Sequence, residues 1–110
     1  MTPDLEVHLY IKHAVGSRML FDVSGANKPF KLEQTGGGWT LTIHDVDPTT
    51  VELLRHNLRE LNIFYFEEQA GHAAVKSWLY DKDCPAIEYD DARRCVIRGD
   101  TKMDYTNDSV

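Results

Sequence analysis

The densest group of side chains that could carry out acid–base or metal chemistry is the stretch His44-Asp45-Val46-Asp47. Imidazole and carboxylate groups transfer protons and bind metal ions. Asp47 is better explained as the cap of a following helix, and His44 as the polar face of a strand, so a site here would need a partner such as His8. The sequence has no histidine pair with the spacing of a zinc-binding helix and no Cys-x-x-Cys pair. We therefore assign no catalytic residue, metal ligand or cofactor, and an enzyme is the less favoured class.

The cysteines and the triple glycine do not support chemistry of their own. Cys84 and Cys95 are too few for a disulfide framework, and neither has an adjacent histidine that would activate its thiol. We expect reduced thiols and a cytoplasmic protein. A phosphate-binding loop needs a strand before it, a helix after it and usually a Lys-Ser or Lys-Thr pair. Residues 36–38 are all glycine but have predicted strands on both sides, which indicates a hairpin turn.

Arginine and tyrosine side chains are the best candidates for contacts with another protein. Arg94 and Arg98 lie on one face of a predicted strand and could bind a carboxylate or a phosphate, although pairing with nearby acids such as Asp90 is favoured. Tyrosine is enriched at protein interfaces, and several tyrosines are expected to point outward. The interaction candidates are Tyr10, Tyr80, Tyr89, Arg94 and Arg98.

Length and charge restrict the classes of partner. The chain has 110 residues and a net charge of −6, from 18 acidic and 12 basic residues. This length is typical of one domain with its own core. The excess of acids opposes binding to nucleic acid and to anionic membranes. No apolar run is long enough to span a membrane, and the acidic start lacks the apolar stretch of a secretory signal. We expect a protein partner and no membrane, with nucleic acid unlikely.

The elements that position these residues are organised around a helix predicted over residues 48–61. Asp47 and Pro48 are typical of the cap and the first position of a helix. Thr49 with Glu52 offers a rival start two residues later. The helix start is therefore predicted to within about two residues.

The buried side of this helix is a stripe of apolar residues at spacings of three and four. The stripe consists of Val51, Leu54, Leu58 and Leu61. Asn62 suits the residue that ends a helix. The apolar run 63–66 follows without alternation, which predicts a central strand buried on both faces.

Strands are predicted for most of the remaining chain. Alternation over residues 5–12, 18–23, 30–33 and 39–44 predicts an antiparallel meander before the helix, and residues 87–98 predict a terminal hairpin. Residues 72–80 fit a helix and a strand, and their alanines favour a short second helix.

The domain is expected to cover residues 1–99, and the polar, acidic residues 100–110 to form a frayed tail. The predicted class is α+β, an antiparallel sheet of about five to seven strands packed on one main helix.

The favoured function is a small acidic module that binds a protein without catalysis, as an inhibitor, immunity or adaptor protein does, with defence and counter-defence factors among the examples. The alternative is a small-molecule-binding protein or a small enzyme with a pocket between sheet and helix. His8, His44 and Arg94 would supply the polar groups of that pocket. Homodimerisation through an exposed sheet edge is a further expectation.

Overall fold

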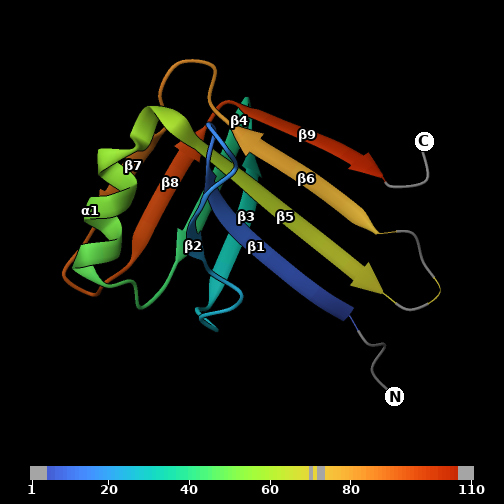
Figure 1. Cartoon of the computed structure of the whole chain (residues 1–110), viewed down its shortest axis with the longest axis horizontal. Helices are drawn as coiled ribbons and strands as arrows, with labels where there is room; N and C mark the ends of the chain where they lie inside the picture. Colours follow the sequence, from blue (N-terminus) through green and yellow to red (C-terminus); the bar gives the residue numbers. More distant parts are fainter. Residues whose placement is uncertain (1–4, 70, 72–73, 107–110) are drawn as a thin grey trace.

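The described chain forms two antiparallel sheets (Figure 1). The computed structural model describes residues 5–69, 71 and 74–106. One sheet has five strands in the order β2-β1-β5-β6-β9, and the other has four in the order β3-β4-β8-β7. The strands are β1 Leu5–His13, β2 Met19–Asp22, β3 Phe30–Thr35, β4 Gly38–Ile43, β5 Leu61–Gln69, β6 Val75–Tyr80, β7 Ala86–Tyr89, β8 Cys95–Gly99 and β9 Thr101–Thr106. The helix α1 (Pro48–His56) and the 3-10 turn η1 (Leu58–Glu60) connect β4 to β5.

The core lies between the two sheets, because alternate side chains of each strand point inward. Val51 and Leu54 of α1 join the same core at one end of the molecule (Figure 1). The largest fully buried apolar side chains are Trp39, Leu9, Ile11, Leu41, Ile43, Leu54, Ile63, Leu79 and Ile97. The predicted α+β class is confirmed.

The prediction of a single sheet, with a meander over the first 44 residues, is wrong. β1 and β2 form a hairpin in the five-stranded sheet, whereas β3 and β4 form a hairpin in the four-stranded sheet. β1 also pairs along its length with β5, which places Tyr10 opposite Phe64. Alternation identifies a strand and its buried side, but it does not identify the neighbouring strand.

The helix is shorter than predicted, since α1 ends at His56 rather than at residue 61. Its C-cap residue is Asn57, whereas Asn62 belongs to β5, so the prediction that Asn62 ends the helix is wrong. The apolar spacing continues past the helix because Leu58 and Leu61 also pack on the core, from η1 and β5. In the described part of the chain, no helix is long and apolar enough to cross a membrane.

The second predicted helix is a strand. Residues 75–80 form β6, in which Ser77 and Leu79 are buried and the side chains between them face the other side of the sheet. Both patterns were present in the sequence, and pairing with β5 on one side and β9 on the other favours the strand. Residues 72–73 lie outside the described residues.

The predicted frayed tail contains a strand. Residues 101–106 form β9, which pairs along its length with β6. The Ser77 hydroxyl donates a hydrogen bond of 2.6 Å to Asp104 Oδ1. A polar edge strand lacks the apolar alternation by which we recognised the other strands. Residues 107–110 lie outside the described part.

The chain passes directly from the four-stranded to the five-stranded sheet at Gly99, where β8 ends, and Asp100. The indole N–H of Trp39 donates to the backbone oxygens of Thr101 (2.8 Å) and Tyr80 (3.2 Å), and so joins the two sheets. A Cβ atom at Gly99 would overlap the Trp39 ring, so this position requires glycine. This connection between the two sheets, which we call the corner, is therefore fixed by the buried Trp39 and by Gly99.

Both predicted hairpin turns are confirmed. The glycines at 36 and 37 link β3 to β4, and β7 pairs with β8. Cys95 lies opposite Tyr89, and Arg93 adopts a positive φ of 62° in the turn between them. Cys84 and Cys95 are free, and burial raises the pKa of the Cys95 thiol to about 11.

Candidate functional site: the outer face of the five-stranded sheet

The run 63–66 is buried on one side only. Ile63 is buried and Tyr65 packs against the core, whereas Phe64 and Phe66 point to the outer face of the five-stranded sheet and are partly exposed. α1 lies at one end of the molecule rather than over this face (Figure 1). The prediction that both faces are buried is therefore wrong, because it assumed a third layer.

Five aromatic side chains form a continuous group on this outer face. We call Tyr10, Phe64, Phe66, Trp78 and Tyr80 the aromatic face. Tyr10 lies opposite Phe64, and Phe64 lies opposite Trp78, so the group crosses β1, β5 and β6. Ring centroids are 5.6 Å apart for Tyr10 and Phe66, 6.4 Å for Phe64 and Phe66, and 4.4 Å for Trp78 and Tyr80. All five side chains are partly exposed.

Two lysines lie over these rings. The ammonium group of Lys12 is 5.7 Å from the Tyr10 centroid and 5.8 Å from that of Phe64. The ammonium group of Lys76 is 5.4 Å from the Phe66 centroid. Within residues 5–69, 71 and 74–106, neither lysine forms an ion pair with an acid. The rings hold both positive charges by cation–π attraction and leave them available to a carboxylate.

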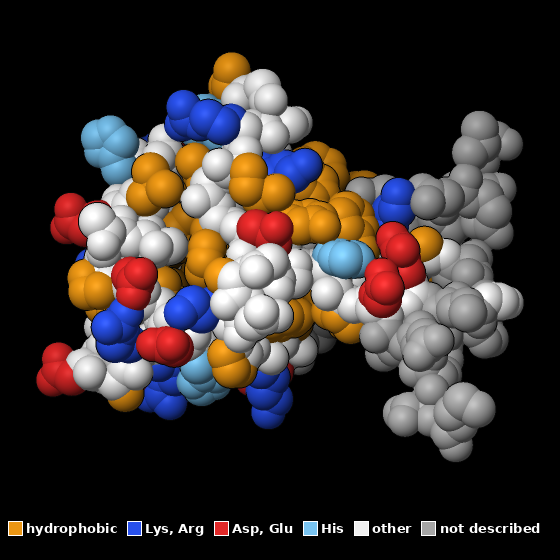
Figure 2. All heavy atoms as spheres, turned by 60° about the horizontal axis from the view of Figure 1, so that its bottom comes forward, with side chains coloured by type: hydrophobic (Ala, Val, Ile, Leu, Met, Phe, Trp, Pro, Cys, Tyr) orange, Lys and Arg blue, Asp and Glu red, His pale blue; other side chains and the backbone are white. Residues whose placement is uncertain are grey.

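Polar groups surround the aromatic face. Asp22 of β2 lies opposite Tyr10, and Glu6 and Glu68 lie opposite each other at the far end of β1 and β5. Burial, followed by the negative charges of Asp22 and Glu68, raises the pKa of the Tyr10 phenol above its ordinary value. Tyr10 therefore stays protonated, able to donate a hydrogen bond. Figure 2 shows hydrophobic side chains that gather on the surface with charged groups around them. An apolar centre with a charged rim is the usual anatomy of a protein interface.

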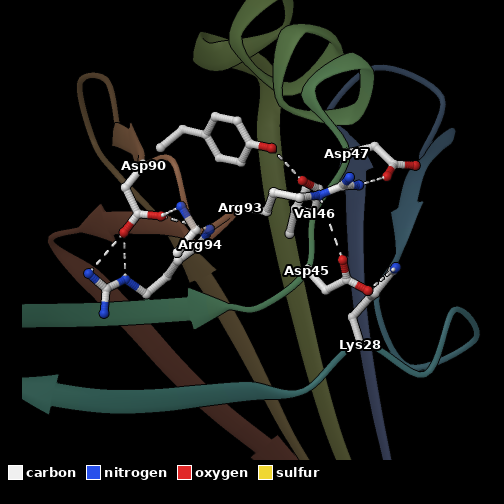
Figure 3. A network of polar contacts seen from close by, with 9 residues as sticks. Lys28, Asp45, Val46, Asp47, Asp90, Arg93 and Arg94 are labelled. Atoms are coloured by element: carbon white, nitrogen blue, oxygen red, sulfur yellow. Dashed lines mark hydrogen bonds and ion pairs between the residues drawn. The ribbon is translucent and has the colours of Figure 1, made fainter.

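The outer face of the four-stranded sheet is polar instead. Its hollow of about 440 Å³ is lined by Glu33, Thr40, Thr42, Glu88, Tyr89, Asp90, Arg94, Val96 and Arg98. Arg94 pairs with Asp90 at 2.9 Å, as predicted (Figure 3). Arg98 pairs with Glu88. A backbone hydrogen bond from Arg94, more than the charge of its guanidinium, lowers the pKa of the Asp90 carboxyl. Acids within the protein thus already neutralise these arginines.

The two acids of the stretch 44–47, which by residue type could carry out acid–base or metal chemistry, are held in ion pairs. We call this group of ion pairs the clamp. Arg93 pairs with Asp45 at 3.6 Å and with Asp47, while Lys28 pairs with Asp45 at 3.2 Å (Figure 3). Asp47 occupies the N-cap position of α1, but its carboxylate pairs with Arg93 instead of capping the helix. The Val46 N–H also donates to the Arg93 carbonyl at 2.9 Å. The loop before α1 is therefore tied to the turn between β7 and β8, and this occupies the acids.

The interaction candidates divide between three places. Tyr10 and Tyr80 share the aromatic face, and Arg94 and Arg98 share the polar hollow. Tyr89 packs against the core, and its hydroxyl donates to the Val46 carbonyl at 2.5 Å, although it was expected to point outward.

The alternative pocket is not assembled from its three predicted residues. His8 lies on β1 beside Tyr10, His44 is exposed in the loop before α1, and Arg94 lines the hollow of the other sheet. None of these three residues lines the hollow at the end of α1, whose lining includes Arg55, His56 and Cys84.

Sequence reasoning missed Phe64, Phe66 and Trp78 as surface residues. The signal for Trp78 is the alternation of β6, where Trp78 and Tyr80 share one face. That signal was lost when residues 72–80 were predicted as a helix.

Comparisons of the chain with protein-family models, with curated proteins and with solved structures found no match.

Proposed function

We propose that the chain is a non-catalytic protein-binding module, which docks its partner on the aromatic face. The observation that carries this proposal is the group of five partly exposed aromatic side chains across β1, β5 and β6. Aromatic residues contribute large apolar area at interfaces, and they dominate the residues whose truncation weakens binding most. Tyr10 and Tyr80 of this face were already candidates from the sequence.

The partner surface is expected to be apolar with acidic groups at its rim. Lys12 and Lys76 lie over the aromatic rings without an acidic partner among the described residues. Carboxylates of a docked protein would pair with both ammonium groups and gain strength as water leaves the interface. The small size and net charge of −6 suit a protein that acts by occupying a partner, as an inhibitor, immunity or adaptor protein does.

The proposal is tested by site-specific photocrosslinking. A benzophenone amino acid replaces Phe66 on the aromatic face in one variant and Thr42 on the polar face in a matched control. The expected result is a crosslink from position 66, absent from position 42, to a protein with an acidic contact segment. Loss of that crosslink after Phe64→Ser would support docking at this face. Equal crosslinking from both positions, or a second copy of the chain as the sole product from position 66, would contradict the proposal.

Single-stranded nucleic acid is the rival ligand for such a surface, because bases stack on aromatic rings and phosphates attract lysine. The net charge of −6 disfavours it. Fluorescence anisotropy with a labelled single-stranded oligonucleotide separates the two cases. Binding that weakens steeply with salt and disappears in Trp78→Ala would replace the protein partner with nucleic acid.

A further inference from the structure

Three metal-ligating side chains meet where β1 begins and β5 ends. Glu6 and Glu68 lie directly opposite each other in the β1–β5 register. His8 is two residues after Glu6 and so points to the same side of the sheet. Neither the loop before α1 nor the hollow of the other sheet contributes to this group, which is separate from the clamp in Figure 3.

The distances within this group suit one small cation. One ligand atom from each of Glu6, His8 and Glu68 lies within 4.8 Å of the other two. The His8 Nε2 atom is 3.6 Å from Glu6 Oε2. A tetrahedral zinc ion with bonds of about 2.0–2.2 Å holds neighbouring ligand atoms about 3.3 Å apart. Small side-chain rotations would therefore bring all three atoms to bonding distance.

The orientation of the imidazole is already restricted. The His8 ring is stacked on the Tyr10 ring, with centroids 5.9 Å apart and planes 17° from parallel. The side chain of His8 is 33% exposed, so an ion can reach its nitrogen from solvent. A held ring loses less rotational freedom when it binds a metal.

Electrostatics also favours a cation between the two strands. Like charges directly opposite each other on neighbouring strands are destabilising. Among the residues that the structure describes, neither Glu6 nor Glu68 pairs with a lysine or arginine. The arginines of the other sheet are paired with acids there, so they do not relieve this repulsion. A divalent ion would neutralise both carboxylates at once.

We propose that Glu6, His8 and Glu68 form a binding site for a divalent cation of the zinc class. One imidazole with two carboxylates suits zinc, whereas calcium and magnesium prefer sites made only of oxygen ligands. Three protein ligands leave one coordination position for water or for an outside ligand. The bound ion would join the start of β1 to the end of β5. This inference does not depend on the proposed docking function.

The test is isothermal titration of the full chain with zinc chloride. The wild type is expected to bind one equivalent, and His8→Ala and Glu68→Gln are each expected to bind at least tenfold more weakly, because each removes one ligand. His44→Ala is the matched control, since this histidine is exposed in a loop elsewhere, and its affinity should equal that of the wild type. Calcium chloride should bind far more weakly than zinc.

A second readout follows from linkage, because an ion that binds only the folded state stabilises it. Zinc should raise the Tm of the wild type and of His44→Ala, but not that of His8→Ala. Equal zinc affinity in the wild type and His8→Ala, or no saturable binding by the wild type, would overturn the proposal. Either result would leave crosslinking from position 66 unaffected, so failure of the metal site and failure of the docking function are distinguishable.

Discussion

The two outer faces of this molecule are built by the same strand alternation but have opposite character. The outer face of the five-stranded sheet presents aromatic rings with two lysines that have no acidic partner among the described residues. The outer face of the four-stranded sheet presents threonines and two arginines, each paired with an acid of the same sheet or its turn. Under the proposed function, the face with the aromatic rings and the two lysines docks the partner, and the face whose arginines are paired within the chain does not. The net charge of −6 conceals this difference, because it averages over both faces.

The largest expected effect is loss of partner binding when the aromatic face is truncated. The double variant Phe64→Ser with Trp78→Ala should weaken binding by about 100-fold, or about 2.7 kcal/mol, because both rings lie at the centre of the surface. The matched control, Thr40→Ala with Thr42→Ala on the other face, should keep the wild-type affinity. Isothermal titration with the crosslinked partner measures both, and equal losses in the two variants would remove the distinction between the faces.

A substitution in the core between the two sheets should lower the stability of the fold rather than the affinity for a partner. Gly99→Ala places a methyl group against the buried Trp39 ring and should lower the free energy of unfolding by about 1–3 kcal/mol. Urea denaturation monitored by tryptophan fluorescence measures the change. Gly36→Ala is the control, since a Cβ there meets no neighbouring atom, and its stability should change much less. A neutral result for Gly99→Ala would mean that the corner is not fixed by this contact.

Reversing the charge of the two lysines and of the two arginines should have different effects on binding and on stability. Lys12→Glu with Lys76→Glu should weaken partner binding by about tenfold, mainly through slower association. Arg94→Glu with Arg98→Glu should leave binding unchanged while lowering Tm, because it sets like charges beside Asp90 and Glu88. Surface plasmon resonance and thermal denaturation together report both properties. Weaker binding in the arginine variant would show that the polar face also contacts the partner.

The smallest effect concerns pH and the turn between β7 and β8. The pKa of Asp90 is lowered in the folded protein, chiefly by a backbone hydrogen bond from Arg94. A lowered folded-state pKa stabilises the fold above the ordinary value of 3.8, and this contribution is lost as the pH falls through the lowered pKa. The Tm difference between the wild type and Asp90→Asn should therefore be full at pH 6, should shrink below pH 3.8 and should then disappear. A difference that is independent of pH would assign the stabilisation to geometry rather than charge.

Local patterns in the sequence predicted most individual elements, but not how they assemble. The start of α1 at Pro48 and both hairpin turns depend on residues close together in the chain. The division into two sheets depends on β1 pairing with β5, from which it is separated by three strands and a helix. The apolar run at 63–66 likewise does not reveal how many layers cover its strand. The aromatic face depends on both the β1–β5 pairing and the exposure of one side of this run. This explains why Tyr10 and Tyr80 were predicted as surface residues but the rings between them were not.

The pairing of β1 with β5 has a consequence for synthesis of the chain. The aromatic face draws on β1, β5 and β6, and the first two strands of the other sheet are translated between β1 and β5. Such distant pairing makes folding slow, because a long loop must close before its contacts form. The ribosome must therefore deliver the chain through Tyr80 before the aromatic face, the proposed docking surface, can form. A nascent chain that stops before β6 would contain the helix and most of the core residues, but not the complete aromatic face.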